Sequence, residues 1–438
     1  MPEPGNKTKA NLEKWCSTEG KIFSSPEAEE AYKARTRRIA DVVQLDIPDR
    51  VPIIPTFGTF PINYCGYNSE EGMFDPVKAI KAFKKVLLEF QPDVFESPVF
   101  TQGPFYEALA YRPLLLPGRK IPSTVNFQFV EAEYVKAEEF YDHFLDDPSD
   151  FILRVFLPRV CGILEPFKKL RPLHENISYY LGIGPNVSQF NKPDITSALE
   201  KLKKASDIAN ELHKSIQSYE SFAMSAGFPP FYGGGTAAPF DVIGDFIRGT
   251  KGIMLDMYRR PEKLLAAMNK LVPYLIDMGL QAKNSQSYFV AIALHKHSEG
   301  FMSQEQFKTF FWPPLRKVMM GLIEEGLIPV PFFEGETTAR LEVIRDIPRG
   351  KAMYQFQNVD LYRAKEILGD IVCFRGNVPI SLLYTGTPEQ VKTYVKKLIS
   401  VVGKGGGLLV GAGSVIDNAK YETVKAMFDA TLEYGVYD

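Results

Sequence analysis

The sequence contains few of the residues that build covalent or metal-bound frameworks. Its 438 residues include only four cysteines and five histidines. Cys16, Cys65, Cys161 and Cys373 lie far apart and form no C-x-x-C pair, so the spacing indicates neither a disulfide framework nor a structural zinc site. We therefore expect reduced thiols, most of them buried.

Signals for membranes and nucleic acids are also scarce. No uncharged apolar stretch reaches about 18 residues, and the opening residues MPEPGNKTKANLEK lack the apolar core of a signal peptide. The 51 basic and 53 acidic residues leave a net charge of −2, so no basic field is available to attract nucleic acid or an anionic membrane. We expect a protein of the cytoplasm that binds neither partner.

The sequence does contain a regular alternation of short apolar runs and amphipathic stretches. A helix is expected at 26–44, a strand at 49–57, a helix at 75–90 and a strand at 91–100. From residue 194 onward the expected helices are 196–218, 261–284, 303–326, 340–348, 361–369, 388–403 and 420–435, and the expected strands are 227–234, 288–295, 327–334, 351–357, 371–377 and 406–413.

This rhythm predicts a parallel sheet covered by helices, because apolar strands that are each followed by a helix must be buried on both faces. About eight such units without a break in composition favour a closed (β/α)8 TIM barrel over a doubly wound sheet. We predict a helical extension over residues 1–45 and the barrel over residues 46–438. In such a barrel the catalytic side chains are expected where the strands end.

Two histidines stand at the end of one predicted strand, in FVAIALHKHSEGFMS (289–303). His295 and His297 are two residues apart, so the period of a strand places them on the same side. This position favours a catalytic role for both. The alternative is a histidine at the barrel rim that only bonds to a backbone carbonyl.

The next strand ends in two acids, Glu334 and Glu336, in PVPFFEGET. Together with His295 and His297, Glu334 could complete an open zinc site of the His2Glu kind. Without a metal, His297 could act as a proton donor and Glu334 or Glu336 as the carboxylate that orients it. Glu336 could instead pair with Arg340 in a solvated loop.

Further residues are candidates for substrate binding. Glu96 in PDVFESPV ends an early strand and could face the pocket. Asn377 in GNVP either closes a turn or binds substrate. Aromatic residues of two loops suit a flat ring ligand, although core packing is the simpler role for any one of them. They are Phe57, Tyr64 and Tyr67 in FGTFPINYCGY and Tyr232 in FPPFYGG.

Three segments resemble the uroporphyrinogen decarboxylase superfamily. They are APFDVIGDFIRGTKGIML (238–255), GFMSQEQFKTFFWPPLRKVM (300–319) and GNVPISLLYTGTPEQVKTYVKKLI (376–399). The resemblance is specific over residues 230–438 and implies a distorted (β/α)8 barrel, with a homodimer as the family's usual assembly. It covers both decarboxylases and cobamide-dependent methyltransferases.

Departures from the family patterns help to choose between these branches. The decarboxylases resembled here carry an arginine-rich stretch after the first strand, whereas residues 57–68 contain no basic residue, so a polycarboxylate would lose its bidentate partners. Their active-site Tyr and Ser fall near Asp245 and His297. The zinc ligands of the coenzyme M methyltransferases fall on Phe332, Glu334 and about Gly413, so that ligand set is absent.

The resemblance implies an enzyme that removes a methyl group from a small, aromatic methoxy substrate and passes it to a corrinoid protein. No corrinoid domain is recognisable in the chain, so the cobalamin-type cofactor is expected on a separate partner. The alternative is decarboxylation of a tetrapyrrole or another carboxylated substrate. A corrinoid or porphyrin carrier without catalysis is a third interpretation, and it gives the acids and histidines at the strand ends no role.

Overall fold

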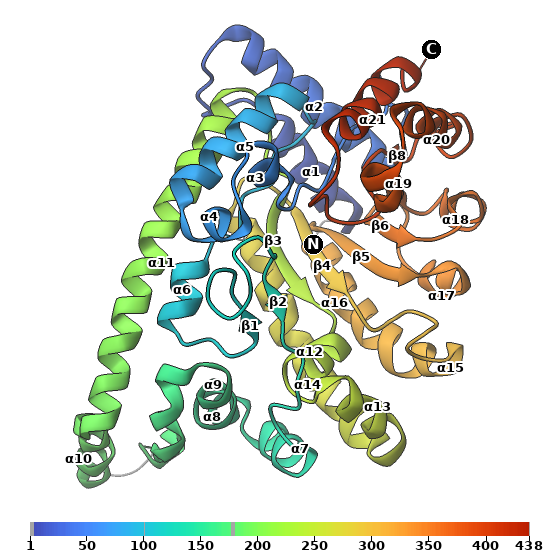
Figure 1. Ribbon diagram of the computed structural model, residues 1–438. Helices are drawn as coiled ribbons and strands as arrows, with labels where there is room; N and C mark the ends of the chain where they lie inside the picture. Colours follow the sequence, from blue (N-terminus) through green and yellow to red (C-terminus); the bar gives the residue numbers. More distant parts are fainter. Residues whose placement is uncertain (1–3, 100, 177–179, 438) are drawn as a thin grey trace.

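A parallel sheet of six strands in sequence order forms the centre of the molecule, shown in Figure 1. The computed structural model describes residues 4–99, 101–176 and 180–437. The strands are β3 (Tyr232–Ala237), β4 (Phe289–Leu294), β5 (Ile328–Glu336), β6 (Met353–Asn358), β7 (Cys373–Arg375) and β8 (Leu408–Leu409).

Two extended segments connect the last strand of this sheet back to the first. Ile53 forms a parallel bridge with Val410 just after β8, and Phe95 forms one with Pro230 just before β3. The backbone N–H of Asp93 donates to the carbonyl of Ile53 at 3.0 Å, which joins the two segments. The predicted strands at 49–57 and 91–100 are therefore reduced to isolated bridges, so the eight-position ring is distorted.

Prolines explain why these two segments do not form regular strands. Pro52 and Pro55 interrupt the first segment, and Pro92 and Pro98 flank the second. Proline has no N–H to donate, so each one removes a hydrogen bond that a ladder would need. The backbone remains extended and keeps its place in the ring.

Helices alternate with the strands from β3 onward, as the sequence predicts. They are α12 (Pro239–Phe246), α13 (Gly249–Arg259), α14 (Pro261–Leu280), α15 (Gln304–Gln306), α16 (Trp312–Glu324), α17 (Leu341–Ile344), α18 (Leu361–Leu368), α19 (Ile380–Thr385), α20 (Pro388–Val401) and α21 (Tyr421–Tyr434). Short 3-10 or π turns are η5 (Gln281–Asn284), η6 (Phe307–Phe311) and η7 (Thr338–Arg340).

The N-terminal helices pack on the barrel and share its core. They are α1 (Pro4–Cys16) and α2 (Pro26–Gln44), and α2 begins after Ser25, whose side chain accepts from the N–H of Ala28. The ring of Trp15 meets that of Phe289 at the start of β4, with centroids 5.2 Å apart. Residues of α1 and α2 belong to the same buried cluster as the strands.

Most of the elements that the sequence does not predict lie between α2 and β3. A two-stranded antiparallel hairpin, β1 (Leu114–Leu115) with β2 (Gln128–Phe129), leads into a group of helices, and the 33-residue α11 runs along one side of the molecule in Figure 1. The helices are α3 (Phe60–Tyr64), α4 (Ser69–Phe74), α5 (Pro76–Phe90), α6 (Gly103–Ala108), α7 (Ala137–Asp146), α8 (Pro148–Phe151), η1 (Ile152–Phe156), α9 (Leu157–Val160), η2 (Gly162–Lys169), η3 (Leu173–Asn176), α10 (Tyr180–Ser188), η4 (Gln189–Asn191) and α11 (Pro193–Ser225).

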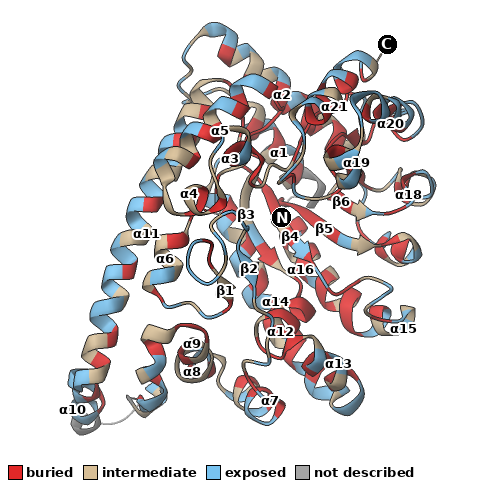
Figure 2. Cartoon of the chain, viewed as in Figure 1, coloured by how far each residue is buried: buried red, intermediate tan, exposed pale blue. Residues whose placement is uncertain are grey.

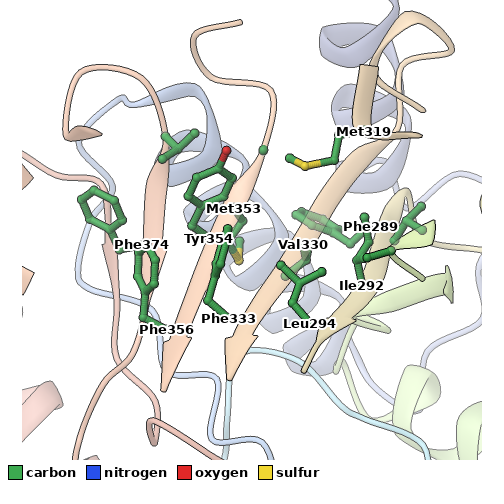
Figure 3. Packing of buried hydrophobic residues seen from close by; sticks show 14 of the residues in the cluster. Phe289, Ile292, Leu294, Met319, Val330, Phe333, Met353, Tyr354, Phe356 and Phe374 are labelled. Atoms are coloured by element: carbon green, nitrogen blue, oxygen red, sulfur yellow. The ribbon is translucent and has the colours of Figure 1, made fainter. Parts of the chain in front are cut away.

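The core lies around β4, β5 and β6, where Figure 2 shows buried strands inside helices that expose their outer faces. Figure 3 shows Ile292 and Leu294 of β4 beside Val330 and Phe333 of β5, with Phe356 of β6 next in the row. All five are at most 1% exposed. Burial of each such side chain contributes roughly 1.5–3 kcal/mol, so this row fixes the strand ends in place. None of the helices that the structure describes is long and apolar enough to cross a bilayer.

Candidate active site

A pocket of about 680 Å³ opens where β4 and β5 end. Ile292 and Leu294 of β4 are buried against the helices, whereas Ala293 and His295, on the other side of the strand, are exposed. The small alanine leaves space beside the histidine. The lining residues are Phe129, Glu131, Asp245, Phe246, His295, Lys296, Ser298, Glu334, Gly335 and Gln357.

His295 is held by helix α12. Its Nδ1 lies 2.6 Å from Oδ2 of Asp245, a buried residue near the end of that helix. One turn earlier, Asp241 accepts the backbone N–H groups of His295 and Lys296 at 2.9 and 3.1 Å. Helix α12 therefore fixes both the backbone and the ring of His295. Asp245, the position that corresponds to the active-site Tyr of the decarboxylases, lies at the centre of the site.

The surroundings of His295 favour its protonated form. The hydrogen bond to Asp245 raises the pKa of His295 to about 9, and the charges of Asp245, Asp241 and Glu334 add to this effect against the opposing effect of burial. Burial raises the pKa of Asp241 itself to about 7, and the charge of Asp245 contributes to that rise. His295 is thus an imidazolium near neutral pH, with Nδ1–H donating to Asp245.

The second ring nitrogen of His295 faces Glu334. Its Nε2 lies 3.7 Å from Oε2 of Glu334, and both side chains are nearly half exposed, 44% and 46% respectively. The structure therefore brings His295 and Glu334 together at the pocket, as the sequence predicts. The Nε2 proton is accessible to a bound molecule, and this is the geometry that a general acid needs.

Lys296 and Glu131 extend this cluster on the other side of Asp245. The Nζ of Lys296 lies 2.8 Å from Oδ1 of Asp245 and 3.2 Å from Oε2 of Glu131, and it also donates to Oγ1 of Thr250 at 3.0 Å. Burial would raise the pKa of Asp245, but the hydrogen bonds from His295 and Lys296 outweigh burial and lower it. Asp245 is therefore a carboxylate shared between two cations.

His297 does not face the pocket, so the prediction that it shares the hollow with Glu334 is wrong. Its side chain is fully buried, and its ring makes edge contacts with Phe311 and Phe333 at centroid distances of 5.9 and 5.2 Å. Burial lowers the pKa of His297 to about 3, and the nearby backbone of Glu334 offsets this only in part. The period of two ends with β4 at Leu294, because the chain bends at Lys296.

The metal site expected from His295, His297 and Glu334 is not assembled. Within residues 4–99, 101–176 and 180–437, no group of three or more His, Cys, Asp or Glu side chains is arranged to hold a metal ion. His297 faces aromatic rings, and Nδ1 of His295 is taken by Asp245. The residues present do not fit a zinc ion held by this triad.

Glu336 forms a local turn instead of joining the site. Its Oε1 accepts the backbone N–H of Thr338 at 2.9 Å and also bonds to the hydroxyl of that residue. The alternative pairing with Arg340 is also wrong, because Arg340 is buried and donates to the backbone carbonyls of His297 and Met302. Neither residue lines the pocket.

Glu96 and Tyr232 lie in a separate buried network inside the barrel. Both bond to Arg375 of β7, Glu96 through an ion pair of 2.9 Å and Tyr232 through its hydroxyl at 3.0 Å. Arg375 is 0% exposed and also donates to Oε1 of Gln355 at 3.2 Å. Burial raises the pKa of Tyr232 to about 12, so its hydroxyl stays protonated. These contacts hold strands together and do not reach the residues that line the pocket.

The remaining substrate candidates also lie outside the pocket. Asn377 accepts from the hydroxyl of Tyr394 at 3.0 Å through its side chain, which fits the turn interpretation. Phe57 stacks on Phe60 at 5.4 Å, and Tyr64 stacks on Tyr421 at 5.3 Å. Tyr67 lies under Nζ of Lys78 at 5.6 Å. These aromatic residues pack against helices and against each other.

The aromatic wall of the pocket comes instead from residues that the sequence did not indicate. Phe129 at the end of β2 meets Phe246 of α12 edge to face, with centroids 5.8 Å apart. Gln357 of β6 lines the pocket and accepts the backbone N–H of Gly335 at 2.5 Å. For Gln357 a signal existed, since polar residues alternate with apolar ones in MYQFQ. For Phe129, in an irregular segment, no periodic signal existed.

Comparisons with known proteins relate this site to one family. The model of the family described as "Uroporphyrinogen decarboxylase (URO-D)" matches residues 176–434, more than half of the chain. Uroporphyrinogen decarboxylases of Saccharophagus degradans and Neisseria gonorrhoeae are 23% and 26% identical over 236 and 259 residues, which cover 52% and 57% of this chain. The matched stretches span 62% and 68% of those relatives.

A solved structure is similar over nearly the whole chain. A methyltransferase from Methanosarcina mazei superposes with a TM-score of 0.58, at 15% sequence identity, and the match covers 92% of this chain and 98% of that one. At this identity the likeness concerns the fold alone. Together with the family match, it confirms the (β/α)8 barrel predicted from the alternation of strands and helices and the distortion that the family resemblance implies.

Proposed function

We propose, from the premise that this chain belongs to the uroporphyrinogen decarboxylase family, that it transfers a methyl group from a small methoxylated aromatic substrate to a corrinoid protein. The observation that carries the proposal is the protonated His295, fixed by Asp245 and accessible at the pocket beside Glu334. Cleavage of an aryl methyl ether leaves a phenolate, and such a leaving group needs a proton donor.

The acidity of His295 suits this task. A simple phenol has a pKa of about 10, whereas the pKa of His295 is raised to about 9. A proton transfer from the imidazolium to the phenolate is then favourable by about 1 pKa unit, about 1.4 kcal/mol. His295 is also almost fully charged at neutral pH, so the donor is ready before the bond breaks.

In the proposed reaction, the C–O bond of the methyl ether breaks and the ether oxygen is protonated. The methyl carbon leaves the ether oxygen, the electron pair of the C–O bond stays on that oxygen, and Nε2 of His295 gives its proton to it. The reduced cobalt of a corrinoid, carried by a separate partner protein, supplies the nucleophile that takes the methyl group. His295 then regains a proton from solvent, to which its side chain is 44% exposed. Asp245 keeps the ring oriented throughout.

The other pocket residues would position the substrate. The edge-to-face pair of Phe129 and Phe246 offers an apolar wall for a flat ring. Glu334 stands 3.7 Å from Nε2 of His295, where it can accept a hydrogen bond from a substrate hydroxyl next to the methoxy group.

Decarboxylation is the second candidate, and the names of the curated relatives favour it. The charges of the pocket oppose a polycarboxylate substrate. Three carboxylates, Glu131, Asp245 and Glu334, line the pocket with only two cations, His295 and Lys296. Both cations are already paired with Asp245. A substrate with several carboxylates would therefore meet a net negative wall without free arginines.

The test is a reconstituted methyl transfer. The purified chain is mixed with a reduced corrinoid protein and a panel of methoxylated arenes, and the release of the phenol is measured. The matched variant His295→Gln should lose activity by at least about 100-fold, because it cannot supply the proton. Failure with every arene, or conversion of uroporphyrinogen at a useful rate, would contradict the proposal.

A further inference from the structure

Five charged side chains of alternating sign form a continuous row along the pocket. The row begins at Glu131 in the segment of β2 and the residues that follow it, here called the β2 segment (residues 128–133), and ends at Glu334 of β5. Glu131 contacts Lys296, Lys296 contacts Asp245, Asp245 contacts His295, and His295 faces Glu334. The successive N to O distances are 3.2, 2.8, 2.6 and 3.7 Å. Four separate parts of the chain contribute these groups: the segment after β2, helix α12, the end of β4 and β5.

We propose that Lys296 and Glu131 are positioning residues that act through Asp245 and set how readily His295 gives up its proton. The inference rests on the proposed function in one respect: the acidity of His295 matters for catalysis if His295 protonates a leaving group. The geometry itself holds for any reaction at this pocket. Lys296 and Glu131 touch neither of the ring nitrogens of His295, so their effect passes through the shared carboxylate.

The placement of Lys296 supports this role. Its side chain is only 6% exposed, although a lysine is costly to bury unless it is paired. Helix α12 gives it room through Gly244, because a Cβ at that position would lie 2.8 Å from Cε of Lys296. The side chain of Lys296 therefore packs closely against α12 at Gly244 and places its ammonium 2.8 Å from Oδ1 of Asp245.

Glu131 connects the chain of charges to the segment that carries the aromatic wall. It follows Phe129 by two residues and accepts the backbone N–H of Thr250 at the start of α13. The same segment is tied to the start of α13 by an ion pair, 2.5 Å long, between Glu133 and Arg248, the N-cap residue of that helix. Contact between Glu131 and Lys296 therefore requires the β2 segment to lie in place over the pocket.

The expected direction of each effect follows from simple electrostatics. The titratable groups around His295 are Asp241 and Asp245 from α12, Glu334 from β5, Lys296 beside it, Glu131 after β2, and His297, whose buried ring is neutral. The Lys296 cation competes with the imidazolium for Asp245, so it makes His295 a stronger acid. Glu131 partly neutralises Lys296, so it makes His295 a weaker acid.

The test is an NMR titration of the His295 ring in protein with isotope-labelled histidine, with the signal identified by its loss in His295→Gln. Lys296→Met should raise the His295 pKa by about 1 unit, and Glu131→Gln should lower it by about half a unit. Added to Lys296→Met, Glu131→Gln should cause a smaller shift than it does alone. Glu138→Gln, which removes a surface ion pair with Arg260, is the matched control and should cause no shift.

The sign of the Lys296→Met effect separates this proposal from a purely structural role. If Lys296 only supported the fold, its loss would let Asp245 move away from His295 and would lower the His295 pKa toward about 6.5. A fall in Lys296→Met, or no shift in Glu131→Gln, would overturn the proposal. Glu131 is partly exposed, so its variant should fold even if Lys296→Met does not. The titration uses no substrate, so its outcome is independent of whether methyl transfer is the reaction.

Discussion

Asp245→Asn offers the sharpest perturbation of the site. The amide keeps the size of Asp245, but it weakens the hydrogen bond that is the largest cause of the raised His295 pKa and removes the negative charge of Asp245. Burial, which opposes protonation, then remains, and Asp241 and Glu334 compensate only in part. We expect the His295 pKa to fall from about 9 to about 6.5 or below.

The rate of methyl transfer should follow the fraction of His295 that is protonated. At pH 7.5 a group with a pKa of about 9 is about 97% protonated, whereas a group with a pKa of about 6.5 is about 10% protonated. Methyl transfer by Asp245→Asn should therefore fall about 10-fold at pH 7.5 from this cause alone. Part of the loss should return at pH 6, where about three quarters of the group is again protonated.

The assay is the initial rate of phenol release from pH 5.5 to 9.5, with kcat and KM determined separately. The alkaline limb of the wild-type profile should move down by at least about 2.5 units in Asp245→Asn. Glu336→Gln, at a carboxylate outside the pocket, is the control and should keep the wild-type limb. A limb that stays in place in Asp245→Asn would refute the assignment of His295 as the donor.

Three further outcomes are expected. Glu334→Gln should lower kcat/KM by about 10-fold in the same assay, because the charged acceptor for a substrate hydroxyl beside Nε2 of His295 is lost; an unchanged value would remove Glu334 from the site. His297→Leu should make the stability less sensitive to acid. The pKa of His297 is about 6.5 in the unfolded chain and about 3 in the folded protein, so the free energy of unfolding of the wild type falls by about 2 kcal/mol from pH 7 to pH 5. The variant should not show this fall in urea unfolding curves. Arg375→Met should destabilise the fold by about 3–5 kcal/mol, since it leaves Glu96 unpaired inside the barrel; a smaller loss would contradict the buried network.

The fold was readable from the sequence where local signals agree with the tertiary structure. Helix α2 spans Pro26–Gln44, the predicted residues, because Ser25 caps it and Pro26 starts it. Helix α5 begins at Pro76 for the same reason, with Asp75 as its cap. The prediction was less accurate for the strands around Ile53 and Phe95. Prolines limit these segments to isolated bridges, which depend on partners distant in sequence.

The site was readable only where a strand controls the direction of a side chain. His295 and Glu334 directly follow apolar strand residues, and the structure brings them together. His297 and Glu336 stand two residues further on. The chain bends before His297, and the pairing of β5 with β6 shifts between Phe333 and Glu336, so the alternation of sides is broken at both places. Phe129 reaches the pocket from an irregular segment more than a hundred residues away in sequence, a placement that no local pattern encodes.

The most direct test of the account is the titration of His295 in the unmodified protein. The imidazole should titrate near pH 9, because its Nδ1 proton is shared with Asp245 at 2.6 Å. A His295 that titrates at or below pH 6.5 would contradict the account, because the imidazole that faces the pocket would then be mostly uncharged at neutral pH.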